Sequence, residues 1–198
     1  MASMEQIQKL RSQTGAGVVD VKKALDETGG DYDKALDLLR KRGEAVALKK
    51  SARDASDGMM FSYIHMGRIG VLLELNCETD FVARTDDFQQ LGKEICMQIA
   101  SMSPRYVSSE EIPADVVSRE REVYVSQIDA SKPKEVQDKI IEGKLKKYYD
   151  EVCLLNQKFF KNEDQTIQAL VTEAIGKIGE NIRVRRFVRF SLDEHEQR

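Results

Sequence analysis

The residues with most potential for chemistry lie between Glu74 and Phe88, in the segment ELNCETDFVARTDDF. Clustered carboxylates are groups that acid–base catalysis can use. The chain has no G-x-S-x-G, H-E-x-x-H or G-x-x-x-x-G-K-[ST] pattern to accompany them. The segment GAGVVD, from Gly15 to Asp20, resembles part of a dinucleotide fingerprint, but it follows a predicted helix and lacks the third glycine. We interpret most carboxylates as solvated surface charge and expect a protein that is not an enzyme.

Metal and redox chemistry are not indicated either. Two histidines and no C-x-x-C pair predict no zinc site, and we expect no cofactor. An odd number of widely spaced cysteines favours reduced thiols packed in a core: Cys77, Cys96 and Cys153. No run of 18 apolar residues and no secretory signal are present, so we expect a cytoplasmic protein without a membrane span.

Phe81 is unusual because it stands at a predicted turn between two acidic clusters. In one interpretation it is a hydrophobic staple that packs against Val82 and Phe88 and fixes the entry into the helix led by Thr85 or Asp86. In the other it is held outward to fill a pocket on a partner, with Asp80 bracing the turn or accepting a hydrogen bond from that partner. Spacing alone favours the staple but leaves both open.

A possible RNA site lies near the C-terminus. GKIG, from Gly176 to Gly179, resembles the loop by which KH domains hold single-stranded RNA, and four arginines follow it. The other interpretation is a helix end with a glycine cap, then a strand with a basic edge. The net charge of −3 comes from interleaved charges, with a slight basic excess only in residues 1–53, so we expect no direct contact with nucleic acid.

The elements that must position these residues predict an α+β fold. Residues 1–53 read as a bundle of three helices, starting at Ser3, Val18 and Tyr32, with Gly43 ending the third. Residues 54–198 read as a small antiparallel sheet covered by helices. Its hairpin turns at Met66–Gly67, and a closing strand within 181–192 pairs with that hairpin. Predicted helices occupy 86–102, 114–130, 132–160 and 166–180.

Two stretches together resemble the bacterial translation elongation factor Ts family. They are LRSQTGAGVVDVKKAL, from Leu10 to Leu25, and ELNCETDFVARTDDF. The segments PRYVSSEEIP and IGENIRVRRFVRF are also similar to it, so the resemblance covers nearly the whole chain in the family's order.

The resemblance implies guanine-nucleotide exchange on elongation factor Tu, the GTPase that delivers aminoacyl-tRNA. It implies that Phe81 intrudes between helices of the GTPase beside its bound Mg²⁺, within the loop Thr79, Asp80, Phe81 and Val82. It also implies that the N-terminal bundle is similar to a ubiquitin-associated module and docks through Arg11, Val18, Val19 and Lys22. Other members often have methionines at positions 18 and 19, but valines keep the apolar character.

The chain length suggests a compact member of this family. Long members have two related subdomains and a helical-hairpin insertion, and 198 residues are too few for all of these. We therefore expect a short form that forms a homodimer through the sheet or the C-terminal strand.

Overall fold

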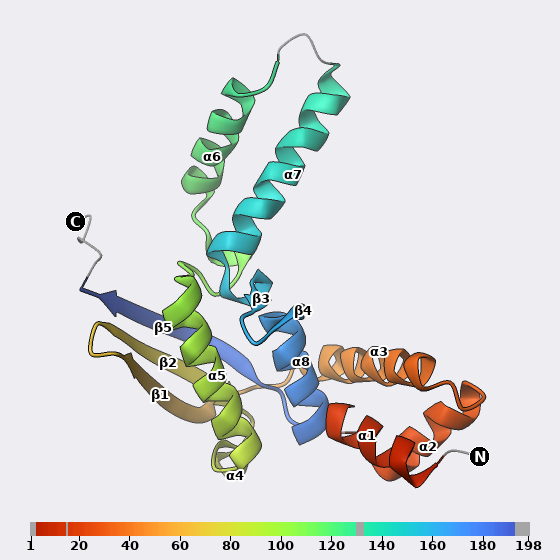
Figure 1. Ribbon diagram of the computed structural model, residues 1–198. Coiled ribbons are helices and arrows are strands. Elements are labelled where there is room, and N and C mark those ends of the chain that lie inside the picture. Colours follow the sequence, from red (N-terminus) through yellow and green to blue (C-terminus); the bar gives the residue numbers. More distant parts are fainter. Residues whose placement is uncertain (1–2, 15, 130–132, 193–198) are drawn as a thin grey trace.

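The computed structural model describes residues 3–14, 16–129 and 133–192 (Figure 1). A bundle of three helices lies at the N-terminal end, a three-stranded antiparallel sheet lies behind helices, and a pair of long helices rises away from it (Figure 1). The predicted α+β class is therefore confirmed, whereas the division at residue 53 stays a prediction. None of the described helices is long and apolar enough to cross a membrane.

The N-terminal bundle has a small hydrophobic core of its own. It consists of α1 (Met4–Thr14), α2 (Val18–Glu27) and α3 (Tyr32–Lys50). Ser3 and Gln6 form a reciprocal cap, with each side chain accepting a hydrogen bond from the other's backbone N–H, at 3.1 and 3.0 Å. Asp31 accepts from the Lys34 N–H and begins α3. The buried side chains are Ile7, Leu10, Val21, Ala24, Leu25, Ala35 and Leu39.

The prediction that Gly43 ends the third helix is wrong, because α3 continues to Lys50. Gly43 does not adopt the left-handed conformation that ends helices. It lies instead where α3 crosses α8: a Cβ added to Gly176 of α8 would come within 3.6 Å of the Gly43 Cα. A Cβ added at Gly43 itself would meet nothing within 4 Å, so the glycine is not required for this packing, and the helix-forming residues that follow continue α3.

The sheet consists of β1 (Asp57–His65), β2 (Ile69–Cys77) and β5 (Arg183–Ser191), in the order β1-β2-β5. Both pairings are antiparallel, which confirms the hairpin and the closing strand. Met66 and Gly67 form the hairpin turn, both with positive φ, as tight two-residue turns require. Alternation along β2 buries one face, and its inward side chains are Val71, Leu73 and Leu75.

Helices cover this inner face. The contacts come mainly from α5 (Asp86–Met102), with α4 (Asp80–Ala83) beside it, and α8 (Ile167–Ile178) packs against α5 and α3. Phe88 is fully buried against Phe61, with ring centroids 6.0 Å apart. Gly92 of α5 lies directly beneath the Phe61 ring, where an added Cβ would come within 2.4 Å of a ring carbon.

The outer face of the sheet is open to solvent. Its apolar side chains come from all three strands and are exposed: Met60, Ile64, Leu72, Val188 and Phe190. Glu74 and Arg186 share this face and form an ion pair at 2.7 Å. The prediction of a sheet covered by helices therefore holds for one face only.

A helical hairpin stands apart from the sheet, formed by α6 (Ala114–Ser126) and α7 (Lys134–Val152) (Figure 1). None of the 13 described residues of α6 is buried. The helix packs mainly on α7, and its Val116 and Val117 lie against the small core of Ile112, Val152 and Cys153. The helices predicted at 114–130 and 132–160 are thus present as a hairpin. The expectation that the chain is too short for two subdomains together with this insertion stays a prediction. Shorter elements flank the pair: η1 (Ser109–Glu111), η2 (Leu154–Asn156), β3 (Lys158–Phe159) and β4 (Asn162–Thr166).

Candidate functional site

The candidate turn consists of Thr79, Asp80, Phe81 and Val82, between the end of β2 and the start of α5. Thr79 has extended backbone angles, and its Oγ1 accepts a hydrogen bond from the Val82 N–H at 3.4 Å, which caps α4. Thr85 caps α5 in the same way, accepting from the Phe88 N–H at 3.4 Å. Two caps six residues apart fix α4 as a single helical turn between strand and helix.

This turn directs Phe81 outward. The Phe81 side chain is 78% exposed, whereas Phe88, seven residues later, is 0% exposed. On the inner side of α4, Ala83 is buried and Val82 packs against the main core. The exposure excludes the staple in which Phe81 packs against Phe88. The structure therefore presents a large aromatic group to solvent on a short, doubly capped turn.

Asp80 lies beside Phe81 and pairs with Arg84 at 2.8 Å, four residues later on the same turn. Both side chains are largely exposed, so the pair contributes little to stability. A partner can therefore exchange this contact for its own at low cost.

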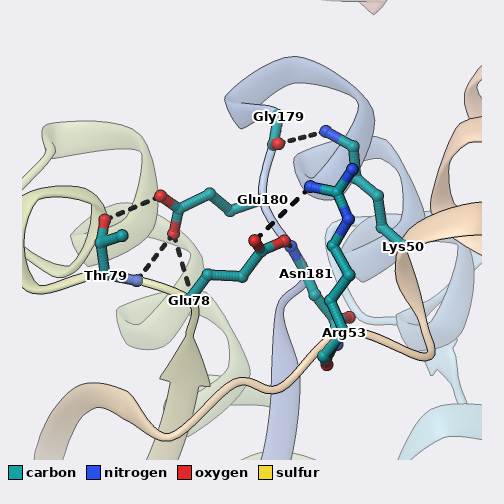
Figure 2. A network of polar contacts seen from close by, with 7 residues as sticks. All are labelled: Lys50, Arg53, Glu78, Thr79, Gly179, Glu180 and Asn181. Carbon is teal, nitrogen blue, oxygen red and sulfur yellow. Dashed lines mark hydrogen bonds and ion pairs between the residues drawn. The ribbon is translucent and has the colours of Figure 1, made fainter.

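A network of carboxylates anchors the start of the turn (Figure 2). The Glu180 carboxylate accepts hydrogen bonds from the Glu78 N–H at 3.1 Å, the Thr79 N–H at 3.0 Å and the Thr79 hydroxyl at 2.7 Å. In return, the Glu78 carboxylate accepts from the Asn181 N–H at 2.7 Å. No sequence pattern indicates these contacts, because about a hundred residues separate the partners and nothing local marks the pairing.

The N-terminal candidates lie on the bundle. Val18 and Val19 begin α2 and are 42% and 64% exposed. Lys22 is exposed one helical turn later on the same side of the helix, while Val21 faces the bundle core. Arg11 is exposed in the last turn of α1. Gly15 lies outside the described residues.

The two groups of candidates are not brought together. The turn at α4 lies on one side of α8 and the bundle lies on the other (Figure 1). A partner that contacts both groups must therefore be large enough to extend across α8.

The possible RNA loop is part of a helix end. Gly176 lies within α8, and Gly179 has φ of 88° and caps the helix, which confirms the helix-end interpretation. Of the arginines that follow, Arg186 is paired with Glu74 and Arg189 donates to the Ala100 carbonyl. No open loop of the KH kind is present at these described residues.

The thiols are packed rather than reactive. Burial raises the pKa of Cys96 to about 12, and burial with the nearby Glu180 charge raises the pKa of Cys77 to about 11. Burial, with lesser contributions from Glu111 and Asp150, raises the pKa of Cys153 to about 11. All three cysteines are free, which confirms the sequence interpretation. Among the described residues, no three His, Cys, Asp or Glu side chains cluster as a metal site would require.

A family model and individual relatives in other organisms identify the same family for this sequence. Residues 4–175 match the family model Elongation factor TS. The Elongation factor Ts of Thermodesulfovibrio yellowstonii is 53% identical over 190 residues, which cover 96% of each chain. That of Fervidobacterium nodosum is 54% identical over 194 residues, 97% of this chain and 98% of the other. That of Thermosipho melanesiensis is 51% identical over 196 residues, 98% and 100% of the two chains.

Proposed function

The chain belongs to the elongation factor Ts family, and from this we propose that it is a guanine-nucleotide exchange factor for elongation factor Tu. It accelerates GDP release in the cytoplasm without forming or breaking a covalent bond, and it needs no cofactor. The observation that carries the proposal is the exposure of Phe81 on a capped turn. An exposed phenylalanine held in place loses little conformational freedom when a partner buries it.

In the proposed mechanism Phe81 acts as a wedge. A GTPase holds GDP through backbone N–H groups around the phosphates and a Mg²⁺ ion that offsets their charge. Phe81 enters a pocket that the GDP-bound form lacks, and this burial contributes about 1.5–3 kcal/mol to the shifted form. Displacement of Mg²⁺ then leaves the phosphate charge less compensated, and each loss of about 1.4 kcal/mol speeds GDP release up to roughly tenfold.

Thr79, Asp80 and Val82 support the wedge in different ways. Thr79 caps the turn, and Val82 anchors it in the core. Asp80 exchanges its exposed pairing with Arg84 for a hydrogen-bond donor of the GTPase. Because binding is reciprocal, the chain binds nucleotide-free elongation factor Tu more tightly than the GDP form, and nucleotide in turn expels the chain.

The N-terminal bundle supplies a second contact. Val18 and Val19 offer an exposed apolar surface, flanked by the positive charge of Lys22, and Arg11 adds a further charge from α1. This combination suits an apolar patch with acidic neighbours on the GTPase. This contact adds affinity for elongation factor Tu, while the turn at Phe81 accelerates GDP release.

A second copy of the chain covers the open sheet face in the proposed assembly. Five exposed apolar side chains lie on this face, with the Glu74–Arg186 pair beside them. A twofold axis places the same patch on both partners, so apolar groups meet apolar groups and the paired charges can pair across the interface. Sedimentation of the wild type and of Phe190→Asp tests this: a dimer should become a monomer, and a wild-type monomer would contradict the proposal.

The direct test of exchange uses elongation factor Tu loaded with fluorescent GDP. We expect substoichiometric amounts of the chain to accelerate release under excess unlabelled GDP. We also expect the complex with nucleotide-free elongation factor Tu to dissociate when GDP is added. An unchanged release rate, or a complex that is indifferent to GDP, would contradict the proposed function.

A further inference from the structure

The turn that bears Phe81 is held by Glu180, about a hundred residues later in the chain. Glu180 follows the last turn of α8, and its carboxylate reaches two backbone N–H groups and one hydroxyl at Glu78 and Thr79 (Figure 2). Glu78 reaches back to the Asn181 N–H. Each segment thus satisfies backbone donors of the other, and neither of the two donors at residues 78 and 79 is part of the strand pairing of β2.

The network also includes the segment that joins the bundle to the sheet. Lys50, the last residue of α3, donates to the Gly179 carbonyl, and Arg53 pairs with Glu78 at 3.5 Å. The Asn181 side-chain amide donates to the Arg53 carbonyl at 2.8 Å. Three segments therefore meet at one point: the connector after α3, the start of the Phe81 turn and the residues between α8 and β5 (Figure 2).

The chemistry of this junction favours a fixed geometry. The Thr79 hydroxyl donates to Glu180 and accepts from the Val82 N–H, so the carboxylate orients the group that caps α4. Glu180 and Thr79 are half-buried, and Asn181 is buried, so water competes only partly for these hydrogen bonds. The direction in which Phe81 projects thus depends on a carboxylate 99 positions away in the sequence, through Thr79.

We propose that Glu180 is a positioning residue for nucleotide exchange: its carboxylate fixes the turn that presents Phe81, and the shared contacts of Glu78 link this turn to the connector of the N-terminal bundle. The inference rests on the proposed function. Glu180 does not touch the partner in this scheme and acts only through the backbone of residues 78 and 79. Its loss leaves Phe81 exposed but variably oriented, so the wedge must be ordered during binding.

The experiment compares Glu180→Ala with Glu180→Gln. Glutamine has the same shape: its amide oxygen can accept from the two N–H groups, and its amide nitrogen can donate to Thr79 Oγ1. We expect the alanine variant to lower the rate of stimulated GDP release by roughly tenfold to a hundredfold, as loss of the three hydrogen bonds that hold the turn implies. The glutamine variant should recover most of this rate. Glu163→Ala, an exposed glutamate on β4, is the matched control and should match the wild type.

Two further measurements separate positioning from general stability. In the free protein, the amide hydrogens of residues 78 and 79 should exchange faster with solvent in Glu180→Ala than in the wild type. In a Phe81→Ala background, Glu180→Ala should cause no further loss of exchange activity, because its effect acts through Phe81. If Glu180→Ala does not fold, Thr79→Val against Thr79→Ser tests the link through Thr79, since serine keeps both the hydroxyl contact with Glu180 and the cap on the Val82 N–H, and valine keeps neither.

The results discriminate between the two proposals. Full exchange activity in Glu180→Ala, unchanged amide protection at residues 78 and 79, or an additive loss in the Phe81→Ala background would each overturn the positioning role. A wild-type chain that fails to accelerate GDP release contradicts the proposed function instead, and amide exchange in the free protein still reports whether Glu180 fixes the turn.

Discussion

Replacing Phe81 with alanine should remove exchange activity while leaving the fold intact. The side chain is 78% exposed, so its loss should change the free energy of unfolding by no more than about 0.5 kcal/mol. On the partner, burial of the benzyl group is worth about 1.5–3 kcal/mol. That free energy corresponds to a reduction in stimulated GDP release of roughly tenfold to 150-fold. Stopped-flow fluorescence with labelled GDP on elongation factor Tu measures it.

Phe88→Ala is the matched control, because it removes the same group seven residues along the chain. Phe88 is fully buried against Phe61, and its truncation should lower the free energy of unfolding by about 3–5 kcal/mol. Urea denaturation followed by circular dichroism gives both values. Near-normal exchange activity in a folded Phe81→Ala would refute the wedge. A loss of stability in Phe81→Ala comparable to that of Phe88→Ala would show that its effect on exchange is indirect.

Three further predictions concern the bundle, the core and the thiols. Val19→Ser should weaken binding to nucleotide-free elongation factor Tu about fivefold to tenfold in calorimetry. Stability should not change, because the side chain is 64% exposed. Unchanged affinity would contradict docking through the start of α2. Gly92→Ala should destabilise the fold by about 1–3 kcal/mol, because the added methyl meets Phe61. Gly143→Ala, on the exposed side of α7, should stabilise the fold by about 0.5–1 kcal/mol. Equal effects of the two variants in thermal melts would contradict this packing. Burial raises the pKa of Cys96 from an ordinary 9.0 to about 12, so the unfolded state loses the thiol proton first as the pH rises. The free energy of unfolding should therefore fall between about pH 9 and pH 12, and it should fall less steeply in Cys96→Ala. Identical slopes of the two proteins in denaturant titrations at several pH values would contradict the shift.

Local patterns were sufficient to predict most elements of the fold. Alternating apolar residues placed Val71, Leu73 and Leu75 on the inner face of β2, and Met66–Gly67 marked the turn of the hairpin. The helix starts predicted at Ser3 and Tyr32 agree with the caps that Ser3 and Asp31 provide. Each of these signals acts within a few residues, so the sequence carries it without reference to the rest of the chain.

The errors arose where a distant contact overrides the local signal. Gly43 looks like a helix end, but α3 continues through it to Lys50 and packs against α8, more than a hundred residues away in the sequence. The helix predicted for residues 132–160 ends at Val152, because the chain then forms η2 and the β3–β4 pair. A glycine signal is ambiguous because glycine can adopt the left-handed conformation of a helix end but also tolerates a helical one.

The candidate site combines a feature that local sequence patterns predict with one that depends on a distant contact. The sequence places Phe81 after a strand and before a helix, but its direction depends on which side of a four-residue helix faces the core. Val82 and Ala83 take the inward positions, and the Thr79 cap then leaves Phe81 on the outward side. What holds that arrangement is Glu180, whose contacts with residues 78 and 79 close a loop of about one hundred residues. No local sequence pattern marks a hydrogen-bonded pair at that separation. Only the folded chain therefore reveals that the turn bearing the exposed Phe81 is held in place by Glu180.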